Sequence, residues 1–158
     1  MERIIESTIA GLTQAKDQLI RVLDNTPDDR INWSPAPTAR TAIQIVAHSA
    51  FSLGFQSDML NGTPYPAPTM AEADAEFWAM EREFTSRDKV LGLLETNFQK
   101  MVTTLKNLDP NNLDIMVKLP FGMGEAPMHY MLVFPALHTR THTAQLEYLQ
   151  TIYGDRKW

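Results

Sequence analysis

The strongest constraint on the fold of this chain is the return of apolar residues at helical spacing in long segments, which proline- and glycine-rich stretches interrupt. The first segment covers residues 2–24 and stops at NTPDD, where Pro27 opposes continuation of a helix. The second begins at Thr41, which can form a capping box with Gln44. A further segment is expected over about 86–108. Each segment predicts an amphipathic helix that buries one face.

The connection after the second helix contains a linker and a short helix. The stretch NGTPYPAP (61–68) has one glycine and three prolines, which is typical of a linker. Residues 70–84, MAEADAEFWAMEREF, predict a short helix on the surface. Because a run of charges is by default a solvated face, we expect its acidic side chains to lie in solvent. They are Glu72, Asp74, Glu76, Glu81 and Glu83.

The last third of the chain predicts an extended excursion and a final helix. Residues 113–127 show alternation around Val117 followed by two glycines, which indicates a short hairpin or extended segment. The last helix is expected to begin near Pro127 and to end at about Tyr153. Pro135 either kinks this helix or moves its start to Phe134.

These elements predict an all-α protein: a four-helix bundle with a short extra helix and a short hairpin before the last helix. A chain of 158 residues suits one domain, expected over residues 1–158. The formal charge of −5 and the scattered basic residues argue against a nucleic-acid partner. The longest apolar run, residues 131–137, is too short to cross a membrane, and MERIIESTIA lacks the pattern of a secretory signal. With no cysteine in the chain, we expect a cytoplasmic location.

Three of the four histidines are expected on apolar helix faces. His138 and His142 are four residues apart and project from one side of the last helix. His48 lies in the middle of the second helix. The three side chains match the ligand set of an open zinc-type site, or else they are core histidines that hydrogen-bond to acceptors across the bundle. His129 is expected at the surface or at a pocket rim.

Some classes of metal protein are disfavoured by neighbouring residues. A metalloprotease of the HExxH type needs a glutamate directly after the first histidine, where this chain has Thr139. A di-iron bundle needs Glu-x-x-His pairs, which do not occur here. Two axial haem ligands would not lie one turn apart on the same helix.

Three stretches together resemble the DinB/YfiT-like family of metalloenzymes, which are bundles of four helices. They are NWSPAPTARTAIQIVAHSA (32–50), LPFGMGEAP (119–127) and HTRTHTAQLEYL (138–149). The resemblance implies that His48, His138 and His142 bind a divalent transition metal, with zinc or nickel as first candidates and iron as a further one. It also implies a small-molecule substrate, a low-molecular-weight thiol such as mycothiol or bacillithiol as cosubstrate, and a possible homodimer.

On this resemblance, the expected function is a metal-dependent, thiol-dependent transferase. The pocket is expected to include Trp33, Phe55, Met59 and Gln145, and no residue is assigned as general acid or base. Two alternatives remain: a bundle that binds metal or a small ligand without turnover, and a structural homodimer with vestigial histidines. The last predicts that replacing His48 with alanine leaves the metal content unchanged.

Overall fold

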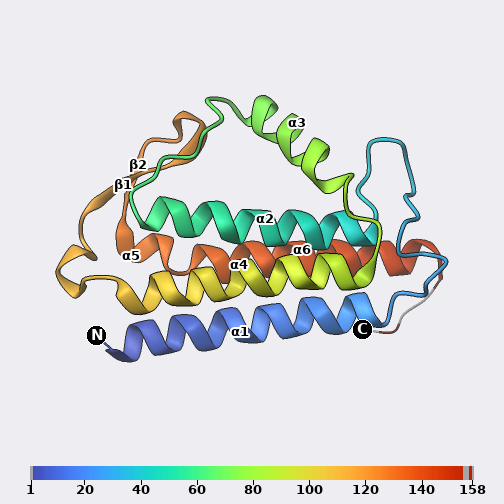
Figure 1. Cartoon of the computed structure of the whole chain (residues 1–158), viewed down its shortest axis with the longest axis horizontal. Helices are drawn as coiled ribbons and strands as arrows, with labels where there is room; N and C mark the ends of the chain where they lie inside the picture. Colours follow the sequence, from blue (N-terminus) through green and yellow to red (C-terminus); the bar gives the residue numbers. More distant parts are fainter. Residues whose placement is uncertain (1, 155–156, 158) are drawn as a thin grey trace.

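The computed structural model describes residues 2–154 and 157, and in this part of the chain four long α-helices form a bundle (Figure 1). Residues 1, 155, 156 and 158 of the expected single domain lie outside the described residues. The long helices are α1 (Glu2–Asp24), α2 (Ala42–Leu60), α4 (Arg87–Asn107) and α6 (Phe134–Ile152). The shorter elements are α3 (Met70–Glu81), β1 (Met116–Lys118), β2 (Glu125–Pro127) and α5 (Met128–Met131).

Around the bundle, the order of the long helices is α1, α4, α2 and α6, since α1 packs on α6 and α2 packs on both α4 and α6. Figure 1 shows that α2 and α4 run in the same direction, opposite to α1 and α6. The chain between α2 and α4 must therefore return along the length of the bundle, and α3 lies in this connection, over α2 (Figure 1). The bundle is not a simple up-down-up-down arrangement.

The helix starts follow the capping signals in the sequence. The side chain of Thr41 accepts a hydrogen bond from the backbone of Gln44, and the side chain of Gln44 accepts one from the backbone of Thr41, which completes the predicted capping box. Thr69 likewise caps α3 through the backbone N–H of Glu72. Asp24 is the last residue of α1, as predicted.

The core lies between the long helices, and leucine is its commonest residue. Burial of one such side chain stabilises the fold by roughly 2 kcal/mol, so these residues hold the bundle together without help from the site. Fully buried examples from the different helices are Leu12, Leu19, Leu53, Leu94 and Leu146.

The last helix differs from the prediction at its start. Residues 128–131 form the separate short helix α5, residues 132 and 133 form a turn, and α6 begins at Phe134. The expectation of one helix from Pro127 was wrong, and the alternative that Pro135 moves the start to Phe134 is confirmed. Pro135 lies in the first turn of α6, where its missing N–H has no helical partner to lose.

The expected extended excursion is an antiparallel hairpin in which Val117 of β1 pairs with Ala126 of β2. Phe121, Gly122 and Gly124 in its connection have positive φ angles, which let the chain reverse within a few residues. The hairpin leads directly into α5 and so lies next to the start of α6 (Figure 1). Among the described helices, none combines the length and the apolar character that crossing a membrane requires.

Candidate metal centre

The three histidines on apolar faces come together between α2 and α6. His48 lies in the middle of α2, and His138 and His142 lie one turn apart in α6. Because α2 and α6 pack against each other, one ring nitrogen from each histidine lies within 4.8 Å of the others. The Nε2 atoms of His138 and His142 are 3.2 Å apart. The arrangement is a group of side chains that can hold a metal ion.

Two of the three imidazoles are oriented by hydrogen bonds from their other ring nitrogen. Nδ1 of His48 donates to Oε1 of Glu81 at 2.7 Å, and Nδ1 of His142 donates to Oε1 of Gln145 at 2.8 Å. A proton on Nδ1 leaves the lone pair on Nε2, the atom that faces the cluster. Hydrogen bonds of this kind fix the tautomer and the ring orientation of metal-binding histidines.

Glu81 corrects a prediction, since it was expected in solvent with the other acids of its helix. Its side chain is completely buried, and its second oxygen accepts a hydrogen bond from Nε of Arg40 at 2.6 Å. The reason is helical spacing: Ala73, Phe77 and Glu81 are four residues apart and form the buried face of α3. Its carboxylate thus joins α3 to the histidine cluster.

Arg40 was not singled out in the sequence, yet it completes this network. Its guanidinium also donates to Asp74 at 3.0 Å. Burial alone would lower the pKa of Arg40, but the hydrogen bonds and charges of Glu81 and Asp74 outweigh burial and raise it. The sequence offered no signal for this role, because Arg40 precedes the second helix in a proline-rich loop.

The environment keeps the paired imidazoles of α6 neutral. Burial, with the neighbouring charges of His142 and His48, lowers the pKa of His138 to about 3. Burial and the charge of His48 likewise lower the pKa of His142 to about 4, although its bond to Gln145 and the charge of Glu81 act in the opposite direction. Neutral imidazoles with free lone pairs are the form that a metal ion binds, so the residues present fit a divalent transition metal.

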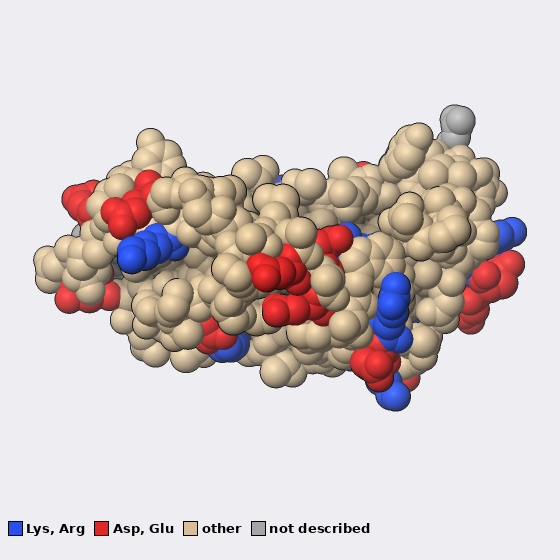
Figure 2. Space-filling model, turned by 90° about the horizontal axis from the view of Figure 1, so that it is seen from above, with Lys and Arg blue, Asp and Glu red and all other residues tan. Residues whose placement is uncertain are grey.

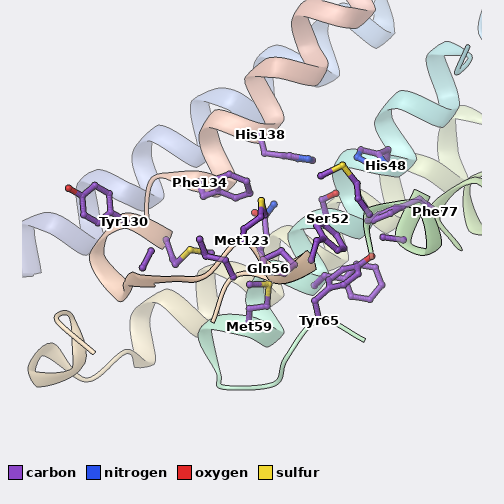
Figure 3. A pocket seen from close by; sticks show the side chains of 18 of the residues that line it. His48, Ser52, Gln56, Met59, Tyr65, Phe77, Met123, Tyr130, Phe134 and His138 are labelled. Atoms are coloured by element: carbon purple, nitrogen blue, oxygen red, sulfur yellow. The ribbon is translucent and has the colours of Figure 1, made fainter. Parts of the chain in front are cut away.

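A cavity of about 710 Å³ opens beside the cluster, and His48 and His138 form part of its wall. In Figure 3 these two side chains point toward each other from α2 and α6, and Tyr65 lies across the cavity from His138. Most of the remaining wall is apolar and comes from α2, α3, the hairpin and the α5–α6 region. The arrangement places a candidate metal site at the edge of a pocket of ligand size.

Of the four residues expected around the pocket, two line the cavity and two do not. Phe55 and Met59 line the cavity. Gln145 lies beside His142 and contacts it, and is not part of the cavity wall. Trp33 lies elsewhere and packs edge-on against Tyr153, with ring centroids 5.7 Å apart.

His129 is exposed, as expected for a surface residue. Its Nδ1 lies 3.1 Å from the carbonyl oxygen of Leu113 and 3.4 Å from a carboxylate oxygen of Asp114. These contacts hold α5 to the segment before β1. His129 does not line the cavity, whereas the following residue, Tyr130, lies at its rim.

The face above α3 carries few basic side chains. In Figure 2 acidic side chains gather near the middle of this face, and wide areas beside them are uncharged. The exposed acids of α3 are Glu72, Asp74 and Glu76.

Three solved structures are among those similar to this chain. YfiT from Bacillus subtilis, described as a probable metal-dependent hydrolase with an unusual four-helix bundle topology, gives a TM-score of 0.74 at 18% identity, over 96% of this chain and 88% of that one. A conserved protein from Enterococcus faecalis gives a TM-score of 0.71 at 15% identity, over 95% of this chain and 97% of that one. The DinB-like protein YjoA from Bacillus subtilis gives a TM-score of 0.65 at 18% identity, over 94% of this chain and 92% of that one. At these identities the likeness establishes the fold.

No curated protein sequence is similar enough to this chain to count as a relative. The family model of the DinB superfamily, however, matches residues 12–146, which include all four long helices in whole or in large part and all three clustered histidines. Because it covers most of the chain, this match establishes the family. The chain belongs to the DinB superfamily.

Proposed function

We propose that this protein is a metal-dependent enzyme that transfers a low-molecular-weight thiol to a small electrophile. In this proposal His48, His138 and His142 hold a divalent transition metal, with zinc or nickel as first candidates and iron as a further one. The observation that carries the proposal is the convergence of three ring nitrogens within 4.8 Å at the edge of a cavity of about 710 Å³.

The chemistry divides between the metal and the chain. A divalent cation bound by the histidines supplies a positive charge that lowers the pKa of a coordinated thiol or water toward neutrality. Glu81 and Gln145 hold two of the imidazoles in the orientation that binding needs. The apolar wall of the cavity excludes water from the electrophile and limits its orientations.

The thiol has to come with a cosubstrate, because the chain has no cysteine. In the transfer, a sulfur–carbon bond forms, the leaving group departs with the electrons of its bond, and the thiol proton passes to solvent. Mycothiol and bacillithiol are the proposed class of cosubstrate.

The test is turnover by purified protein loaded in turn with zinc, nickel and iron. We expect bacillithiol, mycothiol or glutathione to be conjugated to 1-chloro-2,4-dinitrobenzene or a related electrophile, in a reaction that needs both the metal and the histidines. The matched variants are His138→Ala, which removes a cluster histidine, and His129→Ala, which removes an exposed one. Equal rates in the native protein and in His138→Ala would contradict the proposal.

Two other functions are distinguished when the same metal-loaded protein is also given an activated ester without a thiol. Hydrolysis is favoured by the likeness to YfiT, and it predicts metal-dependent cleavage of an activated ester without any thiol. Binding without turnover is favoured by the large apolar cavity, and it predicts ligand affinity but no reaction with any thiol or ester. Turnover that requires a thiol excludes both alternatives.

A further inference from the structure

One face of α2 carries a line of polar side chains from the metal centre into the cavity. His48, Ser52 and Gln56 are spaced by four residues, so they lie on successive turns of the same helix face, and all three line the cavity. From His48 to Gln56 the helix rises about 12 Å. Ser52 and Gln56 are only 6% and 7% exposed. The cavity therefore extends well beyond the metal centre, along a buried polar line.

The polar atoms on this wall lack partners within the described residues. Oε1 of Gln56 is buried and accepts no hydrogen bond there, and the hydroxyl of Tyr65 is buried in the same condition. Buried polar groups without partners are costly in a folded protein, and such groups in a pocket wall are available to pair with a ligand that enters it.

The rest of the wall is aromatic and almost without charge. Phe55 lies edge-on to both Tyr65 and Phe77, with ring centroids 5.0 and 5.6 Å apart. Among the described residues of the wall, the ionisable side chains are two histidines, two tyrosines and Asp74. Asp74 is the one carboxylate among them, and it pairs with Arg40. Burial, with the nearby charge of Glu76, raises the pKa of Tyr65 to about 12, so its hydroxyl keeps its proton and can donate. Without a metal, such a wall offers an anionic ligand no cationic side chain among the described residues.

We propose that the cavity binds an uncharged, largely apolar small molecule, whose flat body packs against Phe55 and Phe77 and whose neutral hydrogen-bonding group pairs with Gln56 or Tyr65. The inference rests on the proposed function in one respect, since it names this molecule as the class of electrophile that reaches the histidines. In the metal-free protein, an anionic molecule of the same shape should bind more weakly than this neutral ligand.

The test is calorimetric binding of three probes that share one body, measured on metal-free protein. The probes are 4-phenylphenol, which is neutral with a hydroxyl group; biphenyl-4-carboxylate, which is anionic; and biphenyl, which has no polar group. We expect 4-phenylphenol to bind at least tenfold more tightly than either of the others, because only it brings a neutral hydrogen-bonding group. Equal or tighter binding of the carboxylate would overturn the inference, as would no binding of 4-phenylphenol at millimolar concentration.

Variants locate the probe in the cavity. Gln56→Met and Tyr65→Phe keep the approximate volume of each side chain and remove its polar group, and Tyr130→Phe makes the same change at the exposed rim. Gln56→Met or Tyr65→Phe should weaken 4-phenylphenol about tenfold, the loss of one hydrogen bond, and should not weaken biphenyl. Tyr130→Phe should change neither. Unchanged binding of 4-phenylphenol in both cavity variants would overturn the inference.

A second readout needs no ligand. Because Gln56→Met and Tyr65→Phe each remove a buried polar atom without a partner, the melting temperature should stay the same or rise in the free protein. A fall of several degrees in both would mean that the two groups serve the fold, and would overturn the inference. Probe binding is measured without metal or turnover, so its outcome is independent of the proposed enzyme activity. A protein that turns over thiols can fail to bind the neutral probe, and a protein without turnover can bind it.

Discussion

At the scale of single residues, the metal centre depends on Glu81, a carboxylate with no exposed surface that joins His48 to Arg40. Replacing it in Glu81→Gln should lower the affinity for zinc or nickel about 10- to 100-fold, because a carboxylate whose two oxygens accept from His48 and Arg40 becomes an uncharged amide with one acceptor oxygen. Competition with a chelator of known affinity measures this change. Glu83→Gln, an exposed acid two residues away, should leave the affinity unchanged. Equal affinities of Glu81→Gln and the native protein would show that Glu81 serves only the fold.

The hydroxyl of Tyr65 should keep its proton at a pH where an ordinary tyrosine has lost it, since burial and then the charge of Glu76 raise its pKa from 10.0 to about 12. The folded state then holds this proton more tightly than the unfolded state, so the free energy of unfolding decreases as the pH rises from 10 toward 12. Absorbance at 295 nm, compared between native protein and Tyr65→Phe, should show no difference in phenolate up to about pH 11. A tyrosine that titrates near pH 10 and is missing from the variant would refute this assignment.

The sequence could place the three histidines but not the residues that support them. His48, His138 and His142 stand out because imidazoles on apolar faces need an explanation. Glu81 was hidden among exposed acids, and the signal that could have found it is its spacing from Ala73 and Phe77. Ser52 and Gln56 share the face of His48 in the same way, but small polar residues within a helix carry no chemical signature of their own.

At the scale of elements, α2 packs tightly against α4 at Gly54. A Cβ atom there would lie 3.0 Å from Oδ1 of Asn97, whose side chain is held by a hydrogen bond from Nδ2 to the carbonyl oxygen of Ala50. Gly54→Ala should therefore lower the free energy of unfolding by about 1 kcal/mol, since overpacking outweighs the gain in helix propensity.

Gly92 is the matched control, because it also lies within a helix but a Cβ atom there would meet nothing in the described structure within 4 Å. Gly92→Ala should raise the free energy of unfolding by about 0.5–1 kcal/mol. Urea titrations of both variants measure the difference. Stabilisation by Gly54→Ala to the same extent as by Gly92→Ala would mean that the two helices separate easily at this point.

Element positions were predictable where periodicity and caps agree. Thr41 and the stripe that continues to Met59 define α2, and Asp24 ends α1 where Pro27 follows. The start of α6 was not predictable, because Pro127 and Pro135 are both acceptable in a first helical turn. Tertiary structure decides between them: β2 occupies the chain through Pro127, and the chain turns again before Phe134.

At the scale of the whole molecule, the proposed metal joins α2 to α6, two helices that are distant in the sequence and adjacent in the bundle. A ligand that binds only the folded state stabilises it by about 2.7 kcal/mol at a concentration 100 times its Kd. For a chain of this length we therefore expect zinc or nickel to raise the melting temperature by about 5–10 °C. A rise of the same size in His138→Ala/His142→Ala would place the effect outside the histidine cluster.

The most direct test of the central claim is the metal content of protein purified without a histidine tag, measured by elemental analysis beside His138→Ala/His142→Ala. We expect close to one divalent transition metal per native chain and its loss from the variant, because the two substitutions remove two of the three converging imidazoles. No metal in either protein, even after incubation with zinc, nickel and iron, would contradict the account. The three histidines would then be polar residues of the core, paired with each other and with Glu81 and Gln145.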